Sequence, residues 1–492
     1  MLVYMEKLNF NHKFSRGLGG IQLPVLFEGI IMNKNINTIN TITAIATPHG
    51  TGGVAVIRIS GEYAIARANE IFVSVQGKSP LEMKGYTCTY GYVMQENQKL
   101  DDCVLTVFRK PNSYTGEDVV EISCHGGRFL TQKILRAVLC EKVRLAEAGE
   151  FTKRAFLNGK LSLTQAEAVA DLISASGENA VKYARSLRDG ATYRKISEFS
   201  EILLRILSSL AVWADYPDED IPEIHAENLE KDLQELLYHM QKLMKSYDYG
   251  KILREGLYTV IIGKPNVGKS TLFNALSGYE RSIVTEIAGT TRDIVEEQIR
   301  LGEVILRLSD TAGVHGTSDK IEQIGVEKSL ASLTHADLVL AVFDLSEKLS
   351  QEDKNLLEKL PPEKTIVICN KLDKGAVWNF SDFSTFSPVE IVEISAKNQN
   401  KLENLEQAVE QFALQQASPA EDGMIANERQ RICLQQAIHA VQEALEALQM
   451  GLAYDAVTVS LDGALDALLQ LTGERVTDKV VDTVFARFCV GK

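Results

Sequence analysis

The spacing of hydrophobic and polar residues divides the chain into regions of different secondary structure. Between residues 43 and 123, short hydrophobic runs such as 54–59 and 103–108 alternate with turns, which predicts the strands of a small α+β domain. Strands return at residues 258–262 and then alternate with helical segments to about residue 413. That alternation is typical of a parallel sheet with crossover helices.

Helical spacing dominates the two regions that flank this second set of strands. Hydrophobic residues recur there at short helical steps, which places them on one face of each helix. The stripes are Phe199, Ile202, Leu203, Ile206, Leu207 and Leu210; Leu229, Leu233, Leu236, Met240 and Leu243; Ile438, Val441, Leu445, Leu448 and Leu452; and Leu461, Leu465 and Leu468. We interpret them as the core of one helical domain interrupted by an inserted α/β domain. Two separate helical domains are the alternative.

Composition narrows the class of protein. A chain of 492 residues is too long for one hydrophobic core and predicts about two or three domains. No apolar run reaches the roughly 20 residues that cross a bilayer. The net charge of -14 argues against a broad basic surface, so any nucleic acid must meet a local patch or a partner. The seven cysteines show no paired C-x-x-C spacing, which favours a reducing cytoplasm.

The same pattern sets approximate domain boundaries. We expect a disordered extension at 1–38, an α+β domain at 39–158, a first helical part at 159–250, the α/β domain at 251–415 and a second helical part at 416–492. The apolar patch at 21–31 lacks a compact basic leader and a small-residue cleavage site, so we predict no signal peptide. Met32 is an alternative start to Met1.

One segment of the α/β region has the sequence of a phosphate-binding loop. Gly263-Lys-Pro-Asn-Val-Gly-Lys-Ser270 follows a strand and opens a helix, which is the context that a P-loop requires. Its glycines let backbone N–H groups converge on phosphates, and Lys269 brings a positive charge to the β- and γ-phosphates. We predict that the Ser270 hydroxyl binds Mg²⁺.

Two further segments are expected to contact the metal ion and the γ-phosphate. Gly289-Thr-Thr-Arg-Asp293 is polar and precedes a strand, and Thr291 is our candidate for the second Mg²⁺ ligand. Asp310-Thr-Ala-Gly313 ends the strand at 304–308, where Asp310 can hold a metal-bound water and Gly313 can contact the γ-phosphate. Val314 follows where many GTPases carry a glutamine that orients the attacking water, so another group must take that role.

Two segments at strand ends predict guanine as the base. Asn370-Lys-Leu-Asp373 places a carboxylate where it can accept hydrogen bonds from N1–H and the 2-amino group of guanine. Adenine has neither donor, so ATP would leave a carboxylate unpaired. Ser395-Ala-Lys397 fits the loop behind the base. Asn266 has a side-chain oxygen suited to a monovalent cation, and a loop residue bonding its own backbone is the alternative.

Other parts of the chain resemble the tRNA modification GTPase family called MnmE or TrmE, of the TrmE-Era-EngA-like P-loop GTPases. The matching strings are Ala46-Thr-Pro-His-Gly-Thr-Gly-Gly53 with Arg58, Pro111-Asn-Ser-Tyr-Thr-Gly-Glu-Asp118, His125-Gly-Gly127, Gly149-Glu-Phe151 with Ala155-Phe-Leu-Asn-Gly-Lys160, and Phe488-Cys-Val-Gly-Lys492. The resemblance implies an N-terminal α+β domain of folate-binding type that forms homodimers. It also implies a discontinuous helical domain and an inserted Ras-like P-loop α/β G domain.

The resemblance extends to the cations and the catalytic residues. It implies that Asn266, Thr285, Ile287 and Thr290 hold K⁺, which replaces an arginine finger where two G domains meet. Glu322 would orient the attacking water, with Lys269 and Asn266 completing the catalytic set, although by composition Glu322 also fits a solvated acid at a helix start. The expected GTP contacts are Asn266, Val267, Gly268, Lys269, Ser270, Thr271, Thr285, Glu286, Ile287, Ala288, Gly289, Thr290, Thr291, Asp310, Thr311, Ala312, Gly313, Asn370, Lys371, Asp373, Ser395, Ala396 and Lys397.

For a 5-formyl- or methylene-tetrahydrofolate, the resemblance implies contacts from Arg58, Glu121, Lys160 and Lys492. Cations suit the glutamate tail of folate, and Glu121 can pair with the donors of the pterin. Without the resemblance, Arg58 and Glu121 are strand-surface charges and Lys160 is a helix-start residue. Cys489 matches a cysteine implicated in the modification step, although a lone cysteine is usually packed.

The implied function is GTP hydrolysis that drives G-domain dimerisation and switching during tRNA modification. With a flavin-dependent partner, MnmG or GidA, in a heterotetramer-type complex, the family places an aminomethyl or carboxymethylaminomethyl group at C5 of the wobble uridine of certain tRNAs. Two alternatives stay open: a GTP-gated RNA or ribosome assembly switch, and a folate-binding enzyme that GTP only regulates. The first predicts a basic appendage, and neither flank of the G domain is rich in lysine and arginine.

Overall fold

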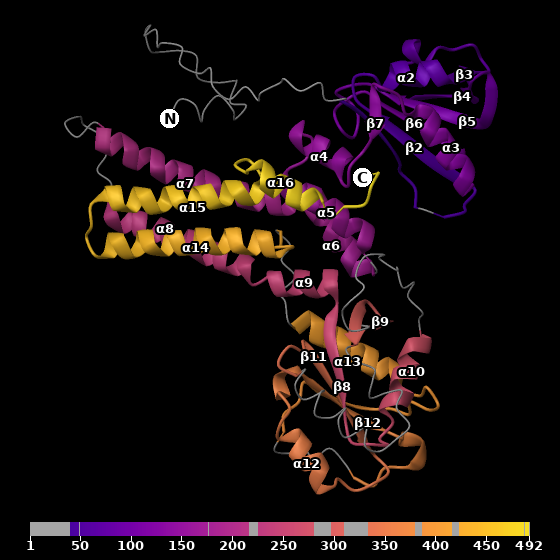
Figure 1. Cartoon of the computed structure of the whole chain (residues 1–492). Helices are drawn as coiled ribbons and strands as arrows, with labels where there is room; N and C mark the ends of the chain where they lie inside the picture. Colours follow the sequence, from indigo (N-terminus) through magenta and orange to yellow (C-terminus); the bar gives the residue numbers. More distant parts are fainter. Residues whose placement is uncertain are drawn as a thin grey trace.

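The computed structural model describes residues 40–48, 50–175, 177–215, 225–279, 297–308, 333–378, 386–415, 423–486 and 488–491. Figure 1 shows an α+β domain, a long bundle of helices and an α/β domain, with the bundle between the other two. The C-terminal residues return to the α+β domain, so both ends of the described chain lie near it.

The N-terminal domain is a seven-stranded sheet with helices on one face. Its strands lie in the order β3-β4-β5-β6-β2-β1-β7, and neighbours are antiparallel except for β1 and β7. The bounds are β1 Thr41–Ile45, β2 Val54–Ser60, α2 Ala64–Ile71, β3 Phe72–Ser74, η1 Pro80–Glu82, β4 Thr87–Gln95, β5 Gln98–Phe108, β6 Val119–His125, α3 Arg128–Val138, β7 Val143–Leu145 and α4 Glu150–Leu157. The strands predicted at 54–59 and 103–108 are confirmed.

Alternation along these strands separates two faces of the sheet. Ile57 and Ile59 of β2 are fully buried in a core that includes residues of α2 and α3. Arg58, between them, therefore points to the opposite face. Only one face of this sheet is covered by α2 and α3, which leaves the Arg58 side for other contacts.

Both helical parts of the chain build one core. The bounds are α5 Leu163–Ser174, α6 Glu178–Arg188, α7 Ala191–Asp215, α8 Ala226–Met244, α9 Tyr247–Glu255, α14 Glu428–Gln449, α15 Tyr454–Thr472 and α16 Asp478–Phe485. Buried residues of α7, α8, α14 and α15 form a single cluster, so the alternative of two separate helical domains is wrong. No helix in the described ranges combines the length and hydropathy that crossing a bilayer requires.

One position of the predicted stripes lies outside the core. Leu452 is 52% exposed, because α14 ends at Gln449 and the chain turns at Gly451, whose φ is +69°. Helical spacing therefore continues past the true end of this helix by about one step. Leu445 and Val441 of the same stripe are buried, as predicted.

The inserted domain is a six-stranded sheet with both faces covered. Its strands lie in the order β13-β12-β11-β8-β10-β9, all parallel to their neighbours except β9. The bounds are β8 Leu257–Ile262, α10 Lys269–Tyr279, β9 Glu297–Leu301, β10 Val304–Leu308, β11 Leu338–Asp344, α12 Gln351–Leu357, η3 Pro362–Lys364, β12 Thr365–Asn370, η4 Leu372–Lys374, β13 Glu390–Glu393 and α13 Leu402–Gln415. Every residue of β11 is buried, as expected for a central strand between two layers of helices.

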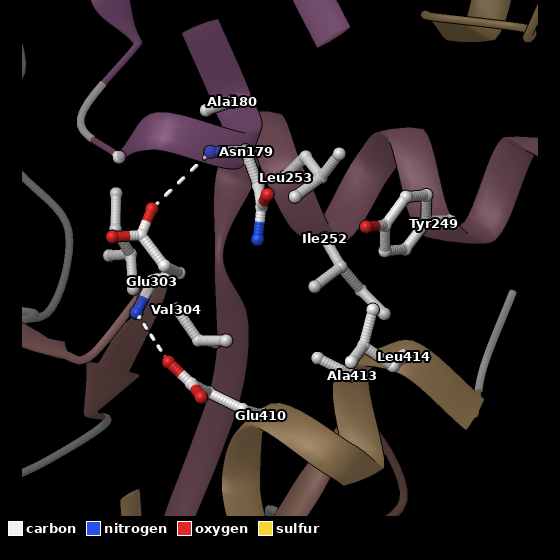
Figure 2. Close-up of a pocket in the computed structure, with 12 residues that line it drawn as sticks. Asn179, Ala180, Tyr249, Ile252, Leu253, Glu303, Val304, Glu410, Ala413 and Leu414 are labelled. Carbon is white, nitrogen blue, oxygen red and sulfur yellow. Dashed lines mark hydrogen bonds between the residues drawn. The ribbon is translucent and has the colours of Figure 1, made fainter. Parts of the chain in front are cut away.

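The turn between β9 and β10 joins this α/β domain to the helical domain (Figure 2). Oε2 of Glu303 accepts hydrogen bonds from the backbone N–H groups of Glu178 and Asn179 at the start of α6, the second at 3.3 Å. The backbone N–H of Glu303 in turn donates to Oε1 of Glu410 in α13 at 3.0 Å. A side chain of one domain thus satisfies the free N–H groups at a helix start of the other.

Candidate functional site

The loop between β8 and α10 forms the floor of the candidate nucleotide site. It follows Ile262 at the carboxyl end of β8 and ends where α10 begins at Lys269. A Cβ on Gly263 would lie 2.4 Å from the carbonyl oxygen of Val342 in β11, so only glycine fits there. Gly268 has φ +101°, and its Cβ would lie 2.3 Å from Nδ2 of Asn370. The close approach of neighbouring strands therefore requires both glycines.

Cationic side chains line this loop. Nζ of Lys269 donates to the carbonyl oxygen of Lys264 at 2.8 Å, which holds the lysine along the loop. Lys264 pairs with the buried carboxylate of Asp353 at 2.9 Å, and Asp353 also closes the capping box of α12. Ser270 lies half-buried in the first turn of α10, beside the positive end of the helix dipole. The loop is suited to an anion.

Asn370 joins the phosphate loop to the loops that were predicted to read the base. Its side-chain Nδ2 donates to the carbonyl oxygen of Val267 at 2.9 Å, and its Oδ1 accepts from the backbone N–H of Ala396 at 3.0 Å. All three residues are buried. One amide side chain thus fixes the relative positions of three of the predicted GTP-binding segments.

The carboxylate of Asp373, which was predicted to contact the base, is oriented by a hydrogen bond from Ser395. The Ser395 hydroxyl donates to Oδ1 of Asp373 at 2.6 Å. This hydrogen bond lowers the pKa of Asp373 below its ordinary value. Ser395 is 1% exposed, whereas Asp373 is at the surface, so the carboxylate is oriented yet open to a ligand. An ionised, acceptor-only group at this point matches the two adjacent donors of guanine.

Lys371, which follows Asn370 in the sequence, is held in place by an ion pair with Asp344. It adopts φ +66°, and its Nζ contacts Oδ2 of Asp344 at 2.5 Å. Burial alone would raise the pKa of Asp344, but the hydrogen bonds from Lys371 and Ser346 lower it overall. The aliphatic stem of Lys371 is thereby held at the end of β12, where it can lie against one face of a bound base.

The remaining predicted GTP contacts divide into two groups. Thr271 is exposed at the start of α10, and Lys397 is exposed after Ala396. The others lie outside the described residues: Thr285, Glu286, Ile287, Ala288, Gly289, Thr290, Thr291, Asp310, Thr311, Ala312, Gly313 and Glu322. Among the described residues, no group of three or more histidine, cysteine, aspartate or glutamate side chains could hold a metal ion. The structure therefore describes the phosphate loop and the base-reading loops of the site.

The predicted folate residues Arg58 and Glu121 are brought together on the face of the N-terminal sheet opposite α2 and α3. They lie directly opposite each other on β2 and β6, and Nε of Arg58 contacts Oε1 of Glu121 at 2.8 Å. The Arg58 guanidinium also lies 5.8 Å from the ring centre of Tyr114 and 5.6 Å from that of Phe151. Two aromatic rings and an ion pair thus share one small region.

The C-terminal segment reaches this region. The carbonyl oxygen of Gly491 lies 3.5 Å from Nη1 of Arg58, and Val490 forms a β-bridge with Ala148. Gly491 has φ +100°, and a Cβ there would lie 2.3 Å from the carbonyl oxygen of Ile45. The neighbouring Cys489 is exposed, so it is not packed as a lone cysteine usually is. Lys492 lies outside the described residues.

Lys160 contacts the loop that carries Tyr114, whose ring lies beside Arg58. Its Nζ donates to the carbonyl oxygen of Pro111 at 3.2 Å, at the start of the segment that carries Tyr114. The hydroxyl of Tyr114 is hydrogen-bonded to that of Thr152 at 2.9 Å. The amino group of Lys160 is exposed and lies along this loop.

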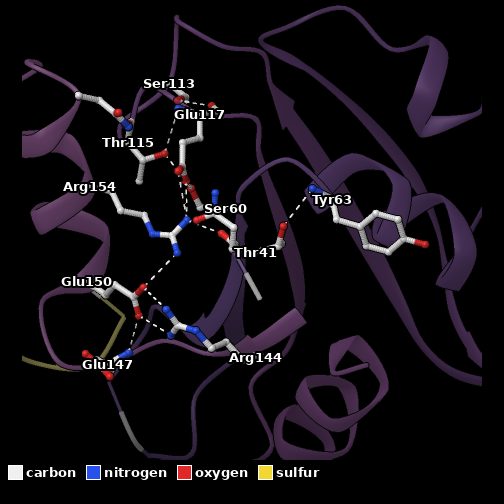
Figure 3. Close-up of polar contacts among 12 residues, drawn as sticks. Thr41, Ser60, Tyr63, Ser113, Thr115, Glu117, Arg144, Glu147, Glu150 and Arg154 are labelled. Carbon is white, nitrogen blue, oxygen red and sulfur yellow. Dashed lines mark hydrogen bonds and ion pairs between the residues drawn. The ribbon is translucent and has the colours of Figure 1, made fainter. Parts of the chain in front are cut away.

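A chain of ion pairs, centred on the buried Arg154 and Glu150, contacts that loop (Figure 3). Arg154 of α4 contacts Glu117 at 2.9 Å and Glu150 at 3.0 Å, and Glu150 also binds Arg144 at 2.6 Å. Burial opposes ionisation of Glu150, but the hydrogen bond from Arg144 and its other partners lower its pKa overall. Ser60 adds a hydrogen bond to Glu117 at 2.7 Å. The network ties α4, β2 and the loop into one unit.

Sequence reasoning missed several of these supporting residues. Lys264 and Asp353 hold the phosphate loop, but Asp353 is distant in sequence and its only local signal is the serine-capped start of a helix. Arg154 stands between two of the strings that carry the family resemblance, and only that position hinted at a role. Asn370 was predicted as a GTP contact, whereas its structural function between loops was not.

Comparison with known families gives two matches. Residues 41–160 match the family model described as GTP-binding protein TrmE N-terminus, and residues 163–489 match the model of the MnmE helical domain. The two matches meet between α4 and α5 and together include nearly all described residues.

Similar proteins were found over most of the chain. A tRNA modification GTPase MnmE of Clostridioides difficile (strain 630) is 44% identical over 92% of this chain and 99% of the relative. One of Carboxydothermus hydrogenoformans is 39% identical over 92% of this chain and 99% of the relative. A solved structure of Aquifex aeolicus Era Y63A bound to GDP.AlF4- is 29% identical, covers 37% of this chain and 66% of that chain, and has a TM-score of 0.26. The assignment to a family rests on the first two proteins and the family models.

Proposed function

The chain belongs to the MnmE family of tRNA modification GTPases, and from this premise we propose how its residues carry out the reaction. We propose a K⁺-dependent GTPase that acts with a flavin-dependent partner at C5 of the wobble uridine of certain tRNAs. The observation that carries the GTP part is the bridge made by Asn370 between the phosphate loop and the loop after β13. That bridge holds a phosphate site and a guanine site at a fixed separation. Because its substrate is tRNA, we place the protein in the cytoplasm.

In the proposed complex, the loop at 263–268 wraps the phosphates with its backbone N–H groups. Lys269 leaves the carbonyl oxygen of Lys264 for the β- and γ-phosphates, an exchange that needs only side-chain rotation. Mg²⁺ neutralises the phosphate charge when bound, and Ser270 and Thr291 would hold it. Asp373 accepts from the guanine donors while Ser395 keeps its carboxylate in place.

We further propose that K⁺ occupies a position beside the phosphates, held by Asn266, Thr285, Ile287 and Thr290. Two features of Asn266 support this proposal: its backbone adopts φ +65°, and its side chain is exposed. Asparagine is among the few residues that adopt this conformation at low cost. Glu322 would then orient the attacking water in place of the missing glutamine. We assign residues 251–415 to this G domain.

The N-terminal domain, which we assign to residues 39–158, is proposed to bind a tetrahydrofolate derivative. The Arg58 and Glu121 pair supports this, because a guanidinium and a carboxylate can turn from each other to an anionic tail and to the pterin donors. Tyr114, which is 38% exposed, offers a ring face beside them, and the buried ring of Phe151 packs against the Arg58 guanidinium. Lys160 and the terminal Lys492 would bind the tail, and the exposed Cys489 is available for the modification step.

Homodimer formation is proposed through the face of the N-terminal sheet opposite α2 and α3. Tyr90 on β4 lies opposite Val104 on β5, and Val104 in turn lies opposite Ser123 on β6. Their side chains are 48% and 40% exposed, and Val54 on β2 is 64% exposed. Val54 and Arg58 share this face, since they are four residues apart on one strand. A second copy that covers these side chains would lie against the proposed folate site.

The proposed function is tested by nucleoside mass spectrometry of tRNA from cells that lack the protein. The expected result is loss of the modified wobble uridine, restored by the wild-type gene and not by a variant with Ser270→Ala. Unchanged wobble nucleosides would contradict the modification role and favour a GTP-gated assembly switch. Titration of purified protein with 5-formyl-tetrahydrofolate tests the second site separately, because Arg58→Gln is expected to lose binding while GTP affinity is kept.

A further inference from the structure

Helix α3 has two sharply different sides. Thr131, Ile134, Ala137 and Val138 are buried against the N-terminal sheet. The side turned to solvent carries only exposed residues: Arg128, Phe129, Gln132, Lys133 and Arg136. We call these five residues the α3 patch. Its composition is unusual for a surface because it combines cations with a large aromatic ring.

Phe129 is the most conspicuous member of the α3 patch. Its side chain is 82% exposed, the highest value among the exposed large hydrophobic side chains of the described residues. A phenylalanine in this position loses most of the stabilisation that burial of such a side chain contributes. The ring therefore contributes little to folding, and it lines the same hollow as Arg128, Lys133 and Arg136.

The charge of the α3 patch contrasts with that of the chain. Arg128, Lys133 and Arg136 have no ion-pair partner among the described residues, and α3 itself contains no acidic residue. The whole chain has a net charge of -14, so these three cations are a local exception. Together with Gln95 at the end of β4, the α3 patch lines a hollow of about 630 Å³.

The α3 patch is separate from the proposed folate and dimer surface. The buried residues of α3 pack against the face of the sheet that Ile57 and Ile122 occupy. Arg58 and Glu121, their sequence neighbours, point to the other face. Figure 1 shows α3 on the side of the N-terminal domain that is turned away from the helical bundle. Neither surface therefore accounts for these exposed residues.

We propose that the α3 patch binds tRNA, with its cations on the sugar–phosphate backbone and Phe129 stacked on an unpaired base. The inference rests on the proposed function, which makes tRNA the substrate. At about 1.5 Å per residue, Arg128 and Arg136 are separated by about 12 Å along the helix. That length suits a row of phosphates better than a single phosphate group, and stacking on an aromatic ring is the usual way to hold a base of a single strand.

Charge complementarity favours RNA over a second copy of this acidic chain or a protein partner. Arginine and lysine spread along a helix, with a glutamine and an aromatic ring between them, make contacts that tolerate any base sequence. A protein interface of this size would be expected to bury an apolar centre, whereas the α3 patch has one apolar side chain among five.

The test measures binding of an unmodified tRNA transcript with uridine at the wobble position, at several KCl concentrations. The full-length wild type is compared with Phe129→Ala and with the triple variant Arg128→Gln, Lys133→Gln and Arg136→Gln. A matched triple variant, Lys231→Gln, Lys242→Gln and Lys245→Gln, removes the same charge from the surface around α8. Val459→Ala, at a side chain 73% exposed on α15, matches the loss of an exposed apolar group.

The triple variant in α3 is expected to lower the slope of log affinity against log salt by about 2, since each lost phosphate contact contributes roughly 0.7–0.9. Phe129→Ala is expected to weaken binding roughly 5- to 150-fold by loss of one stacked base. Both control variants should bind as the wild type does, and all variants should hydrolyse GTP at the wild-type rate without tRNA.

Unchanged tRNA affinity and salt slope in the α3 variants would overturn the inference. So would retained tRNA binding with loss of the flavin-dependent partner or of self-association, which would make the α3 patch a protein interface. A failure of the proposed function can be distinguished from these two outcomes. In that case the wobble nucleosides would be unchanged in cells that lack the protein.

Discussion

The hydroxyl of Ser395 donates to the Oδ1 atom of Asp373 at 2.6 Å, and this contact orients the carboxylate that we propose reads the base. The two residues come from different loops, at the ends of β12 and β13. Asn370, a few residues before Asp373, is bonded to the phosphate loop and to Ala396. The loops proposed to bind the base and the phosphates are therefore linked to one another by hydrogen bonds of partly or fully buried side chains.

The substitution Ser395→Ala is expected to raise the pH below which GTP affinity is lost. In the wild type, the hydrogen bond from Ser395 lowers the pKa of Asp373, so the carboxylate remains an acceptor after an ordinary aspartate would be protonated. Without the hydroxyl that pKa rises, and affinity is lost at a higher pH as the solution is acidified. GTP titrations from neutral pH downward measure this, and superimposable profiles for the two proteins would refute it.

Asp373→Asn is expected to weaken GTP binding by about 10- to 100-fold, because an amide presents a donor to one of the guanine donors. Discrimination against other purines falls at the same time. Xanthosine triphosphate, which carries an acceptor where guanine has its amino group, is expected to bind the variant better than the wild type. Competition titrations with GTP and xanthosine triphosphate check the change, and an unaltered guanine preference would contradict the base-reading role.

Hydrolysis is expected to be faster in K⁺ than in Na⁺, with Asn266→Ala removing most of the difference. The reason is that the smaller ion fits a site of carbonyl and amide oxygens less well. Steady-state phosphate release in the two chloride salts, at equal ionic strength, measures the effect. Equal rates of the wild type in both salts would exclude the proposed K⁺ site.

Glu322→Ala is expected to lower turnover by about 10- to 1,000-fold while leaving GTP affinity nearly unchanged, because orientation of the water matters only for the chemical step. Single-turnover hydrolysis and nucleotide titration separate the two quantities. Collapse of affinity would instead give Glu322 a structural role.

Glu303→Ala is expected to loosen the junction between the α/β and helical domains. The variant loses the acceptor for the N–H groups of Glu178 and Asn179, and loss of such a cap costs about 0.5–2 kcal/mol. Hydrogen exchange is expected to rise at the first turn of α6, with GTP affinity kept. Glu303→Gln is the matched control, since its amide oxygen can still accept. Equal exchange in all three proteins would show that the cap is not important.

The sequence predicted elements whose signals are local. The loop between β8 and α10, the buried stripes of α7, α8 and α15 and the strands at 54–59 and 103–108 were all predicted from spacing and turn residues. The wrong position, Leu452, lies beyond the end of α14, because hydrophobic spacing does not report where a helix stops. The turn at Gly451 would have been the better signal.

Contacts between distant segments could not be predicted in the same way. The Lys264–Asp353 and Arg58–Glu121 pairs join residues on different elements, and either partner alone fits an ordinary surface charge. Glu303 had no signal at all, since a glutamate in a tight turn is common and its partner N–H groups belong to another domain. Such contacts depend on how the helices and sheets pack against one another. The spacing of hydrophobic residues along the sequence does not specify that packing.

The central claim is that the loops at the ends of β8, β12 and β13 form one guanine nucleotide site. Calorimetric titration of nucleotide-free, full-length protein tests it most directly, with GTP and ATP compared in the presence of Mg²⁺ and K⁺. The account predicts saturable heat with GTP at one site for each chain and none with ATP at the same concentrations. No uptake of GTP, or equal uptake of both nucleotides, would contradict it.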